Sequence, residues 1–110
     1  MAKTILIQCE VLGRGNDALG ELLMANFLRL LGESKEKPAA LVFWNTGVRL
    51  VCKDSWALAH LKTLQAQGVE ILACTTCLEY LELADKLAVG RPTTMSKSIQ
   101  SMLSSDMVCL

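Results

Sequence analysis

Two cysteines, Cys74 and Cys77, have the residue type and the spacing best suited to chemistry in this sequence. They follow Val69–Ala73, an apolar run typical of a buried strand, and a helical pattern comes after them. Backbone amides at the start of a helix stabilise an anion, and the thiolate is the reactive form of cysteine. The helix dipole contributes up to about 2 kcal/mol, enough to lower a thiol pKa by roughly one unit. We therefore predict that Cys74 and Cys77 are the catalytic residues of a thiol site.

Two other interpretations of this pair stay open. Cysteine is a small and commonly buried residue, so both thiols could simply pack at the end of a strand. A Cys-x-x-Cys pair also often supplies half of a tetrahedral zinc site. The chain has five cysteines and one histidine, and of the scattered remainder we expect Cys9 alone to lie near the pair. We predict no metal and no cofactor, packing roles for Cys52 and Cys109, and a packing or surface role for His60.

Strand-like and helix-like patterns alternate along the chain. We expect strands at Lys3–Cys9, Ala39–Trp44, Val69–Ala73 and Asp106–Leu110. We expect helices that begin at Asn16 or Asp17, at Asp54 or Ser55, around Leu78–Ala84, and at Thr93 or Thr94. This alternation indicates a mostly parallel sheet with helices on both faces, because parallel neighbours need crossover connections. The predicted fold is an α/β three-layer αβα sandwich that forms a single domain over residues 1–110.

Some finer features of these elements can also be predicted. Gly32 is placed to end the first helix, Val48–Cys52 is a short extended piece, and Gly90–Pro92 is a break. The first and last helices each have an apolar face at helical spacing. These faces are Leu19, Leu22, Leu23, Phe27, Leu30 and Leu31 in the first helix, and Met95, Ile99, Met102 and Leu103 in the last.

The loops after three predicted strands should meet at one edge of the sheet. Ligands of open parallel sheets bind outside the carboxyl ends of the strands. The loops there are Gln8–Asn16, Trp44–Leu50 and Cys74–Cys77. We therefore predict a pocket in which the cysteine pair is accompanied by Asn45, Thr46, Gly47 and Arg14. Arg14 and Arg49 are the loop cations that could stabilise a thiolate.

Composition excludes several classes of function. Eleven basic residues balance eleven acidic ones, so the chain lacks the positive footprint that nucleic-acid binding normally requires. No apolar run approaches the roughly 20 residues that span a bilayer. The short apolar stretch near the start ends at Gln8–Glu10, before it could form a signal-peptide core. We expect a cytoplasmic protein that binds neither nucleic acid nor membrane.

Four stretches of the sequence carry a resemblance to a known family. They are Gly13–Asp17 with Leu19–Gly20, Phe43–Val48, Gly68–Leu78 and Lys86–Gly90. With these stretches the chain resembles the DsrE-like family, and most closely the carboxyl-terminal domain of YedF-type proteins, which are described as sulfurtransferase-like and linked to selenium metabolism. The stretch that contains the cysteine pair is the most specific of the four.

The resemblance implies a flavodoxin-like three-layer sandwich and a cysteine that carries sulfur as a persulfide. Cys74 resembles that cysteine by its position after the third strand, and Cys77 is implied as its resolving partner. DsrE-like domains also tend to form homo-oligomers. YedF-type proteins usually carry a TusA-like domain with a Cys-Pro-x-Pro motif, which is absent from this sequence. The resemblance therefore implies a separate, possibly TusA-like, protein as sulfur donor or acceptor, or else a different role.

These observations lead to three hypotheses. The first is a small sulfur-relay (persulfide-carrying) or thiol-redox protein of the sulfurtransferase-like class, with Cys74 as acceptor and Cys77 as the releasing thiol. The second is thioredoxin-like disulfide exchange, for which neither Pro38 nor Pro92 is placed just before a strand that follows the pair. The third is a non-catalytic module that binds a ligand or a partner at the same edge, since one fold hosts many functions.

Overall fold

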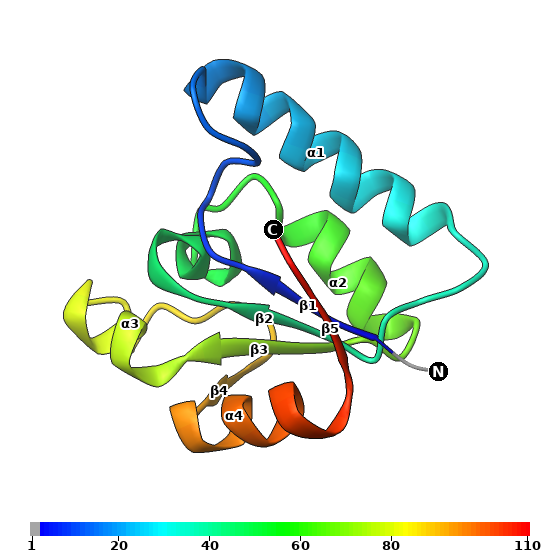
Figure 1. Cartoon of the computed structure of the whole chain (residues 1–110). Coiled ribbons are helices and arrows are strands. Elements are labelled where there is room, and N and C mark those ends of the chain that lie inside the picture. The colour runs from blue at the N-terminus through cyan, green and yellow to red at the C-terminus, as the bar shows by residue number, and fades with distance from the viewer. Residues whose placement is uncertain (1–2) are drawn as a thin grey trace.

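The computed structural model describes residues 3–110, which form one five-stranded sheet with helices packed against it (Figure 1). The strands are β1 (Lys3–Ile7), β2 (Ala40–Phe43), β3 (Glu70–Cys74), β4 (Arg91–Thr93) and β5 (Asp106–Cys109). The helices are α1 (Asp17–Glu33), the 3₁₀ helix η1 (Asn45–Val51), α2 (Leu58–Ala66), α3 (Thr75–Tyr80) and α4 (Met95–Ser104). None of the helices within this described part of the chain is long and apolar enough to cross a membrane.

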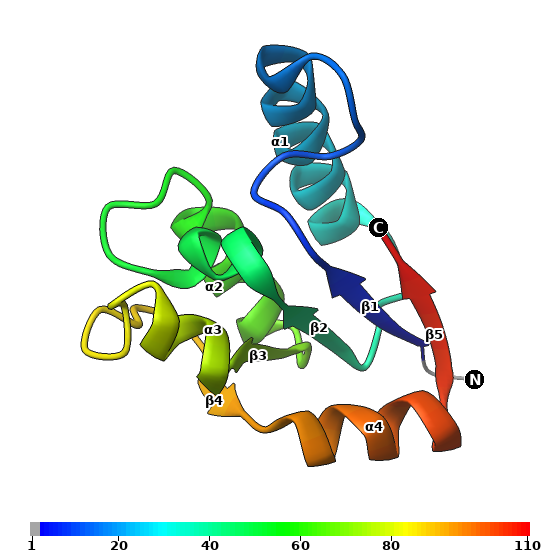
Figure 2. The ribbon, with the colours of Figure 1, turned by 60° about the vertical axis from the view of Figure 1, so that its left-hand side comes forward.

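The sheet is entirely parallel, with the strand order β4-β3-β2-β1-β5. Helices α1 and α2 lie on one face of it, and α4 crosses the other face from one edge strand to the other (Figure 2). The predicted α/β sandwich with a parallel sheet is therefore confirmed. The strand order differs from the 2-1-3-4-5 order of flavodoxin itself. It places β5 beside β1, so that the chain crosses the whole sheet between β4 and β5.

The core lies between the sheet and the α1–α2 layer. The register aligns Ile7 with Phe43 and Phe43 with Ala73, so neighbouring strands present apolar side chains to the same face. Helix α1 buries Met24 and Leu28 against this face. Nearly continuous burial along β2 matches the apolar runs that mark parallel strands covered on both sides.

The buried face of α1 differs from the predicted one. Leu19, Leu22 and Leu30 are exposed, whereas Gly20, together with Met24 and Leu28, is buried. A Cβ atom at Gly20 would lie 2.9 Å from the Val11 Cβ atom and 3.0 Å from the Leu12 carbonyl oxygen. Because only glycine fits this close to the preceding loop, the Gly20 side of α1 must face the loop. This contact sets the rotation of α1 about its own axis, although leucines lie on several sides of the helix.

Hydrogen bonds at the helix starts decide some of the predicted boundaries. Asn16 Oδ1 accepts from Leu19 N at 2.9 Å, and Thr94 Oγ1 accepts from Lys97 N at 3.2 Å, so both predicted caps are confirmed. Helix α1 continues through Gly32 to Glu33, so the predicted end was wrong by one residue. Helix α2 begins at Leu58, later than predicted.

Two segments have a different conformation from the predicted one. The break at Gly90–Pro92 instead leads into β4, which pairs with β3 along the edge of the sheet. Proline is tolerated there because an edge strand can lack one ladder donor. Most of the extended piece predicted at Val48–Cys52 belongs to the 3₁₀ helix η1. Each segment is short, so its pattern carries little periodic signal.

Helix α4 directs its apolar side chains away from the sheet. Met95, Ile99 and Leu103 are 49%, 46% and 85% exposed. Ser98, which lies about a quarter turn round the helix from Ile99, is buried. The sheet face under α4 therefore meets serine side chains, and the apolar row of Met95, Ile99 and Leu103 remains on the outside.

Gly90 provides a test of the contact between β4 and β3. It has φ +77°, and a Cβ atom there would overlap the Ile71 carbonyl oxygen. Gly68 has φ +95° with nothing within 4 Å of its Cβ position. We expect Gly68→Ala to lower the free energy of unfolding by about 1–2 kcal/mol through backbone strain alone. Gly90→Ala should cost about 1–3 kcal/mol more through overlap. Urea unfolding of both variants measures these free energies. An equal loss of stability in the two variants would contradict the close contact between Gly90 and Ile71.

Candidate functional site

The cysteine pair lies where β3 passes directly into α3. Cys74 is the last residue of β3 and also the N-cap of α3, with its Sγ atom accepting a hydrogen bond from Cys77 N at 3.4 Å. The helix begins at Thr75, earlier than the predicted start near Leu78. The early start places Cys77 in the first turn, so both thiols belong to one turn of the chain.

A second contact ties this turn to the edge of the sheet. Thr75 Oγ1 donates a hydrogen bond to the Thr93 carbonyl oxygen at 2.8 Å. Thr93 is the last residue of β4 and pairs with Cys74 in the register of the sheet. The start of α3 is therefore fixed by two contacts. It continues directly from β3 in the sequence, and it is hydrogen-bonded to the end of β4.

Cys77 contacts the loop that follows β2. Asn45 N donates a hydrogen bond to Cys77 Sγ at 3.1 Å. Asn45 has φ +52°, a left-handed conformation that asparagine tolerates better than most residues. Its side-chain Oδ1 accepts from Thr46 N at 2.8 Å, which stabilises the turn locally. The conformation of Asn45 thus supplies a backbone donor to the second thiol of the pair.

The environment of Cys77 raises the pKa of its thiol. Burial is the largest cause, followed by a hydrogen bond with the Cys74 side chain, and the charge of a Cys74 thiolate raises the pKa further. The hydrogen bond from Asn45 N opposes these effects. At neutral pH Cys77 therefore keeps its proton and can donate it toward Cys74.

A cavity of about 300 Å³ opens beside the two thiols. Its lining residues come from the carboxyl ends of β1, β2 and β3 and from the start of α4. They are Gln8, Trp44, Asn45, Cys74, Thr76, Cys77 and Met95. The prediction that three loops meet at one edge of the sheet is therefore confirmed. Cys74 is only 5% exposed, yet it forms part of the cavity wall.

Of the other four predicted pocket residues, the structure places only Asn45 beside the cysteine pair. Asn45 lies against Cys77, but Thr46 directs its hydroxyl to Cys9 Sγ at 3.6 Å. Gly47 is buried, and a Cβ atom there would lie 2.6 Å from the Ile7 carbonyl oxygen, so this glycine permits close packing rather than ligand contact. Arg14 is exposed on its loop and is not part of the cavity wall.

The cavity wall carries no charged side chain. Arg49, the other predicted cation, acts on Cys52 instead, where its charge partly offsets the rise in pKa that burial causes. Cys52 is buried and donates its thiol hydrogen to the Val48 carbonyl oxygen at 3.2 Å. Within residues 3–110 no group of three or more His, Cys, Asp or Glu residues could hold a metal ion.

The sequence does not predict Gln8, Trp44, Thr76 or Met95 as lining residues. Gln8, Trp44 and Thr76 lie inside the loops that the sequence places at the correct edge of the sheet, so their positions carry a usable signal. Met95 reaches the cavity because β4 places the start of α4 beside β3. Because the sequence did not predict β4, it could not predict the position of Met95.

Comparison with known proteins identifies the fold and leaves the family open. No protein-family model matches the chain, and no curated protein matches it either. Among solved structures, MTH1491 from Methanobacterium thermoautotrophicum, a protein of unknown function, is similar over 100% of both chains with TM-score 0.72 and 16% identity. The ychN protein from E. coli is similar over 99% of this chain and 98% of its own, with TM-score 0.72 and 18% identity.

A third similar structure is BT1422 from Bacteroides thetaiotaomicron, a conserved protein of unknown function. It covers 99% of this chain and 94% of its own, with TM-score 0.67 and 17% identity. The ychN protein has a DsrE-like fold. At these identities the likeness concerns the α/β fold alone.

The raised pKa of Cys77 can be tested through Cys74. In Cys74→Ala the hydrogen bond and the charge contributed by Cys74 are both lost, while most of the burial remains. We expect the pKa of Cys77 to fall toward its usual range. The pH dependence of iodoacetamide labelling at Cys77, read by peptide mass spectrometry, measures this. Cys109→Ala is the control, because Cys109 is exposed on β5 and not packed as predicted. An unchanged Cys77 profile in Cys74→Ala would rule out the interaction between the two thiols.

Proposed function

We propose that this protein is a sulfur-relay protein in which Cys74 accepts a sulfane sulfur and Cys77 releases it. The observation that carries the proposal is the hydrogen-bonded turn that holds both thiols at the wall of one cavity. Two thiols within one turn supply both an acceptor and an exit route for the transferred sulfur. The DsrE-like resemblance supports the same roles.

In the first step the Cys74 thiolate attacks the outer sulfur of a donor persulfide. The S–S bond of the donor breaks, the donor leaves as a thiolate, and Cys74 becomes a persulfide. The start of α3 holds the attacking sulfur in place, because Cys77 N donates a hydrogen bond to Cys74 Sγ. The proton held by Cys77 gives the pair one nucleophile and one proton donor.

The second step uses Cys77 after its proton has left to water or to the departing sulfur. The Cys77 thiolate attacks the inner sulfur at Cys74, a disulfide forms between the two cysteines, and hydrosulfide leaves with the electron pair of the broken S–S bond. The transferred sulfur is reduced and the two cysteines are oxidised. Two thiols of an external reductant then restore the pair. An acceptor thiolate that attacks the outer sulfur would instead leave Cys74 reduced.

The size and the uncharged wall of the cavity favour a protein thiol or persulfide as the sulfur donor or acceptor. It holds about 300 Å³ and has no charged wall residue, so it suits a slender neutral side chain better than a nucleotide or another charged cofactor. A separate protein with a TusA-like thiol, as the resemblance implies, would fit this description. The same attack would move selenium if the donor carried it, in line with the YedF-type resemblance.

Sulfur loading of the intact protein tests this proposal. After exposure to a persulfide donor, we expect wild type and Cys77→Ser to gain the mass of one sulfur atom at the peptide that contains Cys74. Cys74→Ser should not gain it, because the acceptor atom is missing. Cys77→Ser should keep its sulfur longer than wild type, because the releasing thiol is absent. Intact-mass and peptide mass spectrometry over time measure both effects.

Cys109→Ser is the matched control, since this exposed cysteine lies on β5 away from the cavity wall. It should load and release sulfur like wild type. Equal loading of Cys74→Ser and wild type would exclude Cys74 as the acceptor. Equal retention by Cys77→Ser and wild type would exclude Cys77 as the releasing thiol.

We also propose that a second copy of the chain covers the apolar row on α4. Met95, Ile99 and Leu103 form this uncharged, exposed row, and Val108 of β5 is 39% exposed. Because the whole chain has no net charge, two copies would meet there without long-range repulsion. Met95 also lines the cysteine cavity, so the partner would add to the wall of the thiol site.

Ile99→Glu tests the association. A carboxylate in the apolar row would be buried without a partner in the assembly, so we expect a smaller species in sedimentation equilibrium than for wild type. Ala59→Glu adds the same charge at an exposed position of α2 and should leave the assembly unchanged. A monomeric wild type, or equal masses for wild type and Ile99→Glu, would contradict this proposal.

A further inference from the structure

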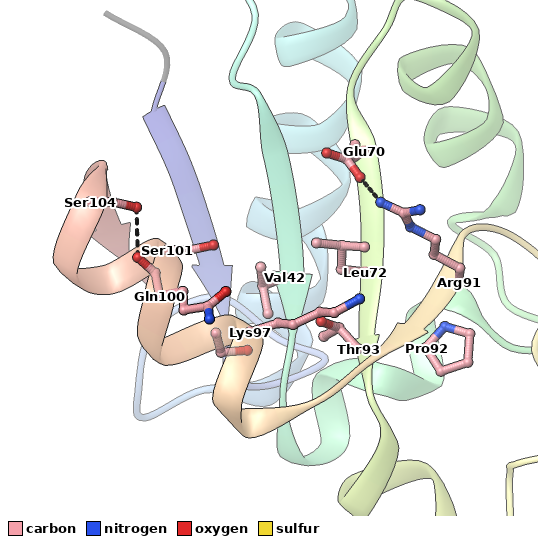
Figure 3. Close-up of a pocket in the computed structure, with 11 residues that line it drawn as sticks. Val42, Glu70, Leu72, Arg91, Pro92, Thr93, Lys97, Gln100, Ser101 and Ser104 are labelled. Carbon is pink, nitrogen blue, oxygen red and sulfur yellow. Dashed lines mark hydrogen bonds and ion pairs between the residues drawn. The ribbon is translucent and has the colours of Figure 1, made fainter.

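A second cavity lies between α4 and the face of the sheet opposite α1 and α2. It holds about 360 Å³, at the lower end of the roughly 300–1,000 Å³ that small-molecule pockets occupy. Figure 3 shows that its walls come from β2 and β3 on one side and from β4 and α4 on the others. It shares no lining residue with the cysteine cavity. The sulfur chemistry therefore does not account for it.

Hydroxyl groups of two nearly buried residues line this second cavity. Ser98 is 3% exposed and Thr93 is 5% exposed, and both belong to the cavity wall. Neither hydroxyl forms a hydrogen bond within the described residues, and no side-chain oxygen there is fully buried without a partner. Both hydroxyl oxygens therefore keep some contact with solvent in the cavity, where they can bind a ligand. Ser101 presents a third hydroxyl from the next turn of α4 (Figure 3).

One cation at the cavity has no carboxylate partner. Arg91 forms an ion pair with Glu70 across β4 and β3, so its charge is largely compensated. Lys97 extends from α4 across the cavity toward β3 (Figure 3). No ion pair of Lys97 occurs in the described part of the chain. The cavity therefore carries a net charge of one positive unit.

The remaining wall of the cavity is apolar. Val42 and Leu72 form its floor on the sheet, and Pro92 lies at its side (Figure 3). Val42 is 2% exposed, so this part of the cavity wall is shielded from bulk water. A ligand that lay against it would be shielded in the same way. A few convergent polar groups beside an apolar surface are typical of sites for small organic molecules.

We propose that this cavity binds a small organic carboxylate. The carboxylate group would lie between the Lys97 ammonium group and the hydroxyls of Ser98 and Ser101, and its apolar body would lie on Val42 and Leu72. Charge-assisted hydrogen bonds to a carboxylate are among the strong ones in proteins. A phosphate dianion fits less well, because one unpaired cation cannot balance it and the nearby Glu70 carboxylate repels it.

Titration of the ¹⁵N-labelled full chain with benzoate tests this proposal. We expect saturable shifts in the amide signals of α4 and β4, with little change near Cys74. Benzamide has the same shape without the charge, and inorganic phosphate has the charge without an apolar body. Both should bind at least about tenfold more weakly than benzoate. Absence of saturable shifts with benzoate, or equal binding of benzamide or phosphate, would overturn the proposal.

Two variants locate the binding site. Lys97→Gln should weaken benzoate binding by about tenfold, because one charge-assisted hydrogen bond is lost. Lys62→Gln removes an equal charge from an exposed position of α2 and should bind benzoate like wild type. Ser98→Ala should also weaken binding. Unchanged affinity in both Lys97→Gln and Ser98→Ala would overturn the assignment, and sulfur loading at Cys74 should be the same in all three variants.

Discussion

The site depends on one hydrogen bond, from Cys77 N to the sulfur of Cys74, because this contact makes a strand end and a helix start coincide. A helix that began later would leave Cys74 in an open loop and Cys77 outside its first turn. The parallel sheet then supplies the surroundings. Carboxyl ends of neighbouring parallel strands lie at one edge, so the loop after β2 can offer the amide of Asn45 to Cys77. The raised pKa of the Cys77 thiol follows from burial and from the Cys74 side chain, and the Asn45 amide opposes this rise.

Much of the architecture could be predicted because apolar runs and helical patterns alternate clearly along the chain. The edge that gathers Gln8, Asn45 and the cysteine pair follows from that alternation alone. The strand β4 could not be predicted, because it is short, contains Pro92, and is stabilised by its pairing with β3 rather than by its own sequence. The hydrogen bond from Asn45 depends on a left-handed residue at the start of η1, which a local pattern does not specify.

The amphipathic helices show a second limit of sequence reasoning. A helical period identifies which residues share a face but does not say whether that face points inward. In α1 the close approach of Gly20 to Leu12 turns several leucines outward. In α4 the serine side faces the sheet and the apolar row faces outward. Both rotations result from tertiary contacts, and the second leaves a polar cavity where a hydrophobic interface was to be expected.

The low exposure of Cys74 has a consequence for selectivity. A reagent must enter beside Cys77 and Trp44 to reach this sulfur, so access depends on shape before it depends on reactivity. In the proposed relay, the low exposure of Cys74 would limit the contact of a bound persulfide with other thiols.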